Sequence, residues 1–265
     1  MTITIGVLAL QGAFLEHLVL LRKAAESLEE KDKFTFLEVR NRDELARCDS
    51  LIIPGGESTT ISFVAAQSDL LEPLRQFVKV DRKPTWGTCA GLILLAEAAN
   101  ATKKGGQELI GGLDVRVNRN HFGRQIESFQ ASLDLKFLGA SHTGFPGIFI
   151  RAPIVEKILP NVSGEQTGEQ QITDTVVAPS RAARDDKAKA AMSSEVEIMA
   201  TLPGRLRKAA EHGAEVSAGD EIGDIIAVRQ GNVFGTSFHP ELTSDIRIHA
   251  WWLQEASRAL SQSSS

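Results

Sequence analysis

The chain has 265 residues, of which 42% are hydrophobic and 24% are charged, and it carries a net charge of −5. An acidic balance argues against a broad nucleic-acid surface, which needs clustered Lys and Arg, and no apolar run is long enough to span a membrane. The chain has two cysteines and no recognisable secretory signal, so we expect a soluble, cytoplasmic protein from a reducing compartment.

Residues 1–100 alternate between predicted strands and predicted helices. In chain order we expect strands at 3–10, 33–39, 50–56 and 84–86, and helices over about 14–28, 42–47, from a cap at Ser58, over 71–79 and after Cys89. The first strand is continuously apolar, as a strand buried on both faces of a parallel sheet should be. This alternation predicts an α/β fold, a doubly wound and mostly parallel sheet with helices on both faces.

From about residue 113 the pattern changes to strands without helices. We expect strands at 113–117, 128–135, 147–152, 196–201, 224–231 and 233–238, and a C-terminal helix around 246–256. The polar stretches 161–194 and 204–222 are interpreted as surface insertions, the first of them disordered, because neither can bury enough apolar area to offset its ordering entropy. Residues 1–260 are expected to form one domain with these insertions, followed by a flexible tail at 261–265.

Cys89 lies between a predicted strand and a predicted helix, in the segment Gly87-Thr88-Cys89-Ala90-Gly91. This spacing is the cysteine counterpart of the G-x-S-x-G nucleophile elbow, in which a sharp turn exposes the nucleophile and requires small residues two positions to either side. The helix N-terminus favours a thiolate, and the Ala90 N–H is a candidate oxyanion donor. The alternative is a buried structural cysteine in a tight turn.

His239 is the best candidate for the base that a thiolate nucleophile needs, because it directly follows a buried strand. Glu241, two residues on, can fix the imidazole. In parallel sheets functional groups gather at the carboxyl ends of the strands, and Cys89 and His239 both occupy that position. The other histidines lie in predicted helices or polar turns, where a satisfied or solvated role is the default: His17, His121, His142, His212 and His249.

A zinc site is an alternative for His239 and Glu241, since H-x-E also opens the zinc deaminase signature. That signature requires a P-C-x-x-C partner, and Cys48 stands alone in a predicted helix. We therefore expect neither a metal nor a cofactor.

The segment P-G-G-E-S-T is a third candidate part of the site. Gly55 and Gly56 permit backbone geometry closed to other residues, so that an N–H can point at an oxyanion, and Glu57 can meet an ammonium group. The alternative is a glycine turn followed by a helix cap at Ser58 or Thr59. A phosphate loop is disfavoured because no G-K-[ST] follows at P-loop spacing.

Taken together, G-T-C-A-G-L, S-F-H-P-E-L and P-G-G-E-S-T resemble the motifs of class I (triad) glutamine amidotransferases. The segments ALQGAFLEH near the start, NRNHFGRQIESF at 118–129 and FIRAP at 149–153 are similar to those of one branch, the glutaminase subunits of pyridoxal 5′-phosphate synthase. The resemblance covers residues 1 to about 160, 195–203 and 223–260. It implies a flavodoxin-like α/β fold and the hydrolysis of L-glutamine to L-glutamate and ammonia.

The same resemblance implies a role for each site residue. Cys89 would be the nucleophile, His239 the base and Glu241 its orienting carboxylate. Further positions would bind glutamine or complete the oxyanion hole beside Ala90: Gln11, Gly56, Glu57, Ser58, Arg119, Ile150 and Arg151. A zwitterionic substrate does need an arginine for its carboxylate and an acid for its ammonium. Without the motifs, the two arginines would be interpreted as surface or structural ion pairs.

The resemblance also implies a partner. Free ammonia would be lost by protonation and diffusion, so such glutaminase subunits dock on a (β/α)₈-barrel synthase that assembles as a dodecamer, and pass ammonia through a tunnel. Synthase binding is expected to order the oxyanion loop, which leaves the isolated subunit weakly active. Two alternatives remain open: a non-catalytic docking subunit of the same complex, and a cysteine redox sensor or hydrolase on a similar fold.

Overall fold

Five parallel strands carry the candidate site in the computed structural model, which describes residues 2–100, 107–119, 128–139, 143–160, 175–202 and 223–263. In sheet order they are β2 (Phe34–Val39), β1 (Ile3–Leu8), β3 (Ser50–Ile53), β4 (Thr85–Thr88) and β13 (Val233–Thr236). Every neighbouring pair among them is parallel. This is the strand order of flavodoxin-like sheets, whose ligands bind outside the carboxyl ends of the strands. The predicted α/β fold with a mostly parallel sheet is therefore confirmed.

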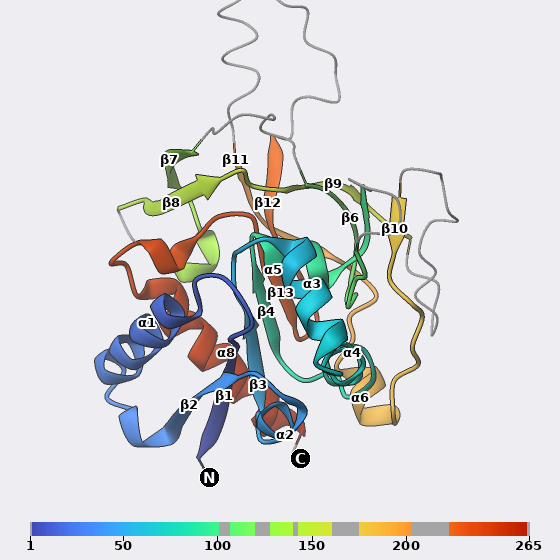
Figure 1. Cartoon of the computed structure of the whole chain (residues 1–265). Helices are drawn as coiled ribbons and strands as arrows, with labels where there is room; N and C mark the ends of the chain where they lie inside the picture. Colours follow the sequence, from blue (N-terminus) through green and yellow to red (C-terminus); the bar gives the residue numbers. More distant parts are fainter. Residues whose placement is uncertain are drawn as a thin grey trace, which may run out of the picture.

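Pairings that are all antiparallel except β5 with β6 extend the sheet beyond β13 (Figure 1). Strand β12 (Asp224–Gln230) pairs with β13 and with β11 (Glu197–Leu202). Further out lie β9 (Ile154–Ile158), β6 (Leu113–Asn118), β5 (Ala96–Asn100) and β10 (Thr175–Val177). Strands β7 (Ser128–Leu133) and β8 (Phe145–Ile150) form a separate antiparallel pair. The strands predicted from residue 113 onward are thus all present.

Helices cover both faces of the sheet (Figure 1). One face is covered by α1 (Phe14–Ser27) and α8 (Arg247–Ser263), and the other by α2 (Arg42–Ala46), α3 (Ser58–Gln67), α4 (Leu71–Arg75) and α5 (Ala90–Leu95). A hydrophobic core lies on each face of the sheet, and strand β3 contributes side chains to both. Leu51 and Ile53 pack on the α5 side, and Ile52 packs on the α1 side. Burial on both faces explains why Leu51, Ile52 and Ile53 form a continuous apolar run.

Shorter helical segments connect these elements. They lie at Lys31–Lys33, Gln76–Val80, Lys136–Leu138, Asp186–Ala190 (α6) and Pro240–Leu242. Among the described helices, none has both the length and the apolar character needed to cross a membrane.

Four segments differ from the sequence prediction. Strand β9 was not predicted, although it pairs with β6 and β12 inside the main sheet. The helix after Cys89 ends at Leu95, and the chain continues directly as β5, because the next residues pair with β6 and β10 on either side. Residues 175–194 were assigned to a polar insertion, but they contain β10 and α6, with Ala178 and Ala188 buried. Helix α8 continues to Ser263, into the expected tail. The rest of the expected insertions, 161–174 and 204–222, lies outside the described residues.

A buried ion pair explains why residues 175–194, although assigned to a polar insertion, pack against the sheet. Lys79 and Glu97 are 0% and 1% exposed, and their charged atoms lie 2.9 Å apart. Lys79 also donates to the Pro179 carbonyl at 2.8 Å, and the Gly112 N–H donates to Glu97 at 2.7 Å. Burial raises the pKa of Glu97 to about 7 against the opposing charge of Lys79. The pair therefore anchors the segment after β10 to the helical segment Gln76–Val80 and to β5.

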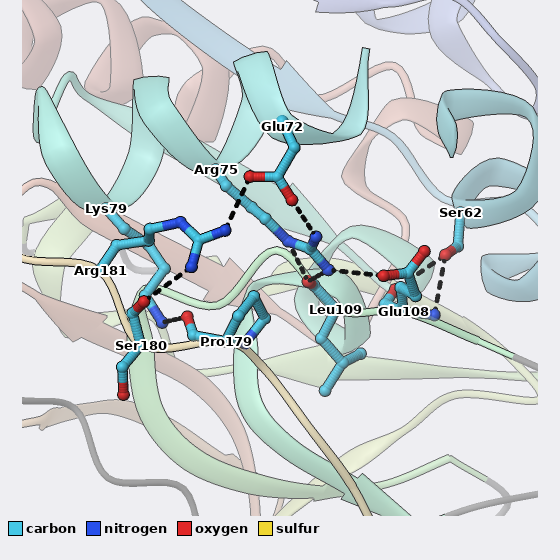
Figure 2. A network of polar contacts seen from close by, with 9 residues as sticks. All are labelled: Ser62, Glu72, Arg75, Lys79, Glu108, Leu109, Pro179, Ser180 and Arg181. Carbon is cyan, nitrogen blue, oxygen red and sulfur yellow. Dashed lines mark hydrogen bonds and ion pairs between the residues drawn. The ribbon is translucent and has the colours of Figure 1, made fainter. Parts of the chain in front are cut away.

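Arg75 on α4 extends this network (Figure 2). Its guanidinium donates to the Leu109 carbonyl at 2.8 and 3.0 Å and pairs with Glu72 and Glu108. Glu72 in turn accepts a hydrogen bond from Arg181 at 2.8 Å. Helix α4 thus holds two chain segments, one before β6 and one after β10, through charged contacts as well as through the hydrophobic core that Leu74 shares with Leu109 and Ala178.

We expect Lys79→Met to lower the free energy of unfolding by about 3–5 kcal/mol, because it leaves the Glu97 carboxyl buried without its partner. The double variant Lys79→Met/Glu97→Gln should recover most of this loss, since the new amide still accepts from the Gly112 N–H. Urea denaturation measures both. Equal stability of the single and double variants would contradict the assigned role of the pair.

Candidate active site

The carboxyl ends of β1, β3, β4 and β13 lead into loops that surround a cavity of about 330 Å³. The residues that line this cavity are Gln11, Gly56, Glu57, Ser58, Thr59, Cys89, Ile93, Arg119, Ile150, Arg151 and His239. They include every residue that the sequence analysis assigned to the site except Ala90, which follows Cys89, and Glu241, which contacts His239. The structure therefore brings the predicted residues together.

Cys89 occupies the turn from β4 into α5 with a backbone φ of +48°, a conformation that L-residues with side chains rarely adopt. Its N–H donates to the Thr236 carbonyl on β13 at 2.7 Å. A Cβ on Gly87 would lie 2.4 Å from the carbonyl carbon of Gly91, so the turn requires glycine there. This is the geometry of the predicted nucleophile elbow, in which strain holds the side chain at the cavity.

His239 follows β13 and is tied to Glu241, with 2.7 Å between Nδ1 and Oε1. Its backbone N–H donates to the Ile148 carbonyl on β8 at 2.8 Å. Burial lowers the pKa of His239, but the hydrogen bonds and charges of Cys89 and Glu241 outweigh burial and raise the pKa to about 10. Thiol, imidazole and carboxylate thus form one connected row, the arrangement that activates a cysteine nucleophile.

Gln11 and the loop after β3 fold onto each other and form one wall of the cavity. Gln11 Oε1 accepts the Glu57 N–H at 2.8 Å, and the Gly55 carbonyl accepts the Ala13 N–H at 3.1 Å. A Cβ on Gly56 would lie 2.4 Å from Gln11 Oε1. Gly56 is therefore needed for the close approach of the two loops, whereas a Cβ on Gly55 would meet His239.

Glu57, rather than Ser58, caps helix α3, so the cap predicted at Ser58 was wrong. The Glu57 carboxylate accepts the Thr59 and Thr60 N–H groups at 3.2 and 2.6 Å. Burial raises the pKa of Glu57, but these hydrogen bonds outweigh it and lower the pKa overall. Burial lowers the pKa of Arg119 to about 10, against the opposing charge of Glu57. The cavity thus has an anionic group and a cationic group on its lining.

Ile150 and Arg151 close the cavity from the end of β8. The Ile150 carbonyl oxygen lies 4.0 Å from Cys89 Sγ, and Arg151 is exposed with a backbone φ of +45°. Ala90 is buried at the first position of α5, where backbone N–H groups have no intrahelical acceptor. An N–H at this position is suited to bind negative charge that develops next to Cys89.

The sequence analysis missed two histidines beside this row. His17 on α1 and His249 on α8 are both 0% exposed, with 3.0 Å between His17 Nδ1 and His249 Nε2. His17 Nε2 lies 3.4 Å from Glu241 Oε2. The missed signal is helical spacing, because each histidine stands four residues before a buried leucine, Leu21 or Leu253, on the apolar face of its helix. The other three histidines of the chain lie outside the described residues: His121, His142 and His212.

The chain is similar to known proteins in both sequence and fold. A model of the SNO glutamine amidotransferase family matches residues 7–184 and 196–258. The chain is 41% identical to the "Probable pyridoxal 5'-phosphate synthase subunit PDX2" of Arabidopsis thaliana, over 99% of this chain and 90% of the relative. It is also 41% identical to the pyridoxal 5′-phosphate synthase subunit PdxT of Streptomyces avermitilis, over 94% of this chain and 91% of that one. A crystal structure of a glutamine amidotransferase matches with a TM-score of 0.63 at 33% identity, over 96% and 98% of the two chains.

Acidification should destabilise the protein because His17 and His249 are buried and neutral. Burial lowers the pKa of His17 well below 6.5 and that of His249 to about 3, so the unfolded chain binds protons that the native protein does not. Their contribution to stability is present above pH 6.5 and is lost as the pH falls toward 3. Each group adds a slope of up to about 1.4 kcal/mol per pH unit. We expect His249→Phe to flatten the pH dependence of the free energy of unfolding. If the slope of the free energy against pH is unchanged, the His249 imidazole is not the source of the acid destabilisation.

We expect Gly55→Ala to slow the alkylation of Cys89 by iodoacetamide at least several-fold. The added methyl would lie 2.3 Å from His239 Cε1, so the imidazole has to leave its place beside the thiol. Peptide mapping by mass spectrometry separates Cys89 from Cys48, whose pKa burial raises to about 12. Gly139→Ala serves as a control for backbone strain alone, because its φ of +86° disfavours alanine while no described atom lies within 4 Å of the added methyl. An unchanged rate in Gly55→Ala would mean that the loop does not hold His239.

Proposed function

The chain belongs to the SNO glutamine amidotransferase family, and we propose that it is the glutaminase subunit of a pyridoxal 5′-phosphate synthase. One observation carries this proposal: Cys89 at a strained strand-to-helix turn shares a cavity with a His239 imidazole that Glu241 holds in place. The names of the relatives from Arabidopsis thaliana and Streptomyces avermitilis support the choice of synthase.

Cys89 acts as the nucleophile and His239 as the general base and acid. The Cys89 thiolate attacks the side-chain carbonyl carbon of L-glutamine, and His239 holds the thiol proton. The tetrahedral intermediate then expels ammonia, which takes that proton from the imidazolium, and leaves a glutamyl thioester. Water attacks the thioester, with His239 as the base, and L-glutamate leaves as the thiol is regenerated. Glu241 keeps the Nδ1–H of His239 pointed away from the thiol throughout.

The rest of the cavity binds the oxyanion and the amino-acid end of the substrate. The Ala90 N–H and the Gly56 backbone, with Gln11 beside it, surround the developing negative charge. Arg119 and Arg151 are suited to the α-carboxylate and the ionised Glu57 to the α-ammonium, with Ser58 and Ile150 completing the lining. A cavity of about 330 Å³ is at the small end of ligand sites, which suits a single amino acid.

The product ammonia requires a partner that receives it. At neutral pH free ammonia is protonated and loses its nucleophilicity, so a subunit that only released it would waste the reaction. We place the chain on a (β/α)₈-barrel synthase, assembled as a dodecamer, which takes ammonia through a tunnel. A cytoplasmic location suits this biosynthetic role and the two free cysteines, Cys48 and Cys89.

Release of L-glutamate from L-glutamine by the purified chain, with and without the synthase subunit, tests the proposal. We expect turnover that rises when synthase is added and falls by at least about 10³-fold in Cys89→Ala, as the loss of a covalent nucleophile does. Cys48→Ala is the matched control, because it removes the other buried thiol, which does not line the cavity, and it should retain wild-type turnover.

The outcomes distinguish the alternatives. Binding to the synthase without turnover would favour a non-catalytic docking subunit. Turnover that survives Cys89→Ala would refute the covalent mechanism.

A further inference from the structure

The second oxygen of the Glu241 carboxylate needs a donor. Oε1 accepts from His239, while Oε2 is turned away from it into the interior, and the side chain is 0% exposed. A buried carboxylate oxygen without a donor is costly, because its charge has lost hydration. Among the described residues Oε2 has no hydrogen-bond partner within normal geometry, and His17 Nε2 faces it at 3.4 Å. Such contacts are often long in an unliganded site.

The tautomer of His17 decides whether it can donate to Glu241. His17 Nδ1 and His249 Nε2 lie 3.0 Å apart, so a single proton lies between them. If His249 donates, His17 carries its own proton on Nε2, which faces Glu241. If His17 donates instead, its Nε2 can accept from the Thr88 hydroxyl, but the same lone pair also faces the Glu241 carboxylate oxygen. His249 Nδ1 would then also carry a buried N–H with no hydrogen-bond partner among the described residues. The first arrangement leaves no buried N–H unpaired and is favoured.

Both imidazoles are neutral, which the first arrangement requires. Burial lowers the pKa of His17, and the charges of His249 and His239 lower it further. Burial also lowers the pKa of His249 to about 3, although Asp245 opposes the shift. His17 Nε2 has a second neighbour, Thr88 Oγ1 on β4 at 3.3 Å, directly before the nucleophile in the chain. The imidazole is thus wedged between the carboxylate and the strand that leads to Cys89.

We propose that His17 is a positioning residue of the active site: its neutral imidazole donates from Nε2 to Glu241 Oε2, and His249 fixes the tautomer by donating to Nδ1. The hydrogen-bonded row then runs from His249 through His17, Glu241 and His239 to Cys89. Glu241 is held by both oxygens, so it cannot rotate away from His239. The catalytic consequence rests on the function proposed above.

His17 also links this row to the Gln11 loop. The loop leads directly into α1, and His17 lies in the first turns of that helix. One rigid helix therefore carries both the loop wall of the cavity and the donor to the Glu241 carboxylate. A displacement of α1 would act on both at once.

Replacement of His17 by leucine tests the proposal through a split between kcat and KM. We expect His17→Leu to lower kcat for L-glutamine roughly tenfold to a hundredfold, the loss expected for one hydrogen bond to a charged group. The KM should stay within about twofold, because His17 does not line the cavity. His17→Gln, whose amide can donate to the same oxygen, should recover part of kcat. His249→Phe removes the donor to His17 Nδ1, so that the tautomer of His17 is no longer fixed. This variant should give an intermediate loss of kcat.

Leu21→Ala is the matched control on the same helix. Leu21 is also 0% exposed, and its truncation should reduce stability without changing kcat. A kcat loss in His17→Leu that Leu21→Ala reproduces at equal stability would overturn the proposal. So would a wild-type kcat in a folded His17→Leu variant.

Two readouts do not depend on glutamine turnover. Long-range ¹H–¹⁵N spectra of the wild-type protein should show His17 protonated on Nε2 alone, and a proton on Nδ1 would refute the assignment. Alkylation of Cys89 by iodoacetamide should slow in His17→Leu and recover in His17→Gln. If the wild-type protein fails to hydrolyse glutamine, the proposed function fails, while these two measurements still decide the role of His17.

Discussion

Close backbone contact between β3, β4 and α5 is the constraint on which the rest of the structure depends. A Cβ on Gly91 would lie 2.0 Å from the Ile53 carbonyl oxygen, and one on Gly87 would collide with Gly91. The helix can therefore start directly at the end of β4, against β3, with Cys89 in a strained turn between them. Since β13 pairs with the other edge of β4, the same geometry brings His239 to the thiol.

The fold buries charged groups in two places, and in each place neighbouring polar groups compensate the lost hydration. At the site, Glu241 lies between two imidazoles, with His239 on one oxygen and His17 beside the other. At β5, Lys79 and Glu97 pair without exposure to solvent. Breaking either arrangement leaves an uncompensated charge, so each fixes the relative position of elements far apart in the sequence. In both places charge specifies which elements pack together.

Features that depend on neighbouring residues in the chain could be predicted from the sequence. The alternation of elements was sufficient for the fold class, and the glycine spacing around Cys89 with the strand before His239 was sufficient for the Cys89, His239 and Glu241 row. Other residues of the cavity lining were assigned only through the family resemblance: Gln11, Ser58, Arg119, Ile150 and Arg151. The role of His17 depends on contacts with α8 and with the loop after β13, which no local pattern contains. Likewise, residues 175–194 are held by contacts with distant parts of the chain, because Lys79 donates to the Pro179 carbonyl and Arg181 donates to Glu72. The same limit applies to Glu57, whose role as a helix cap depends on where its side chain turns.

Covalent trapping tests the central claim most directly, namely that Cys89 is a nucleophile in a cavity shaped for L-glutamine. The protein would be incubated with the chloroketone analogue of L-glutamine, and the intact mass and tryptic peptides would be measured. We expect one adduct per chain, located on Cys89, with labelling slowed by added L-glutamine and not by D-glutamine. No adduct, an adduct on Cys48, or labelling that L-glutamine does not slow would contradict the account.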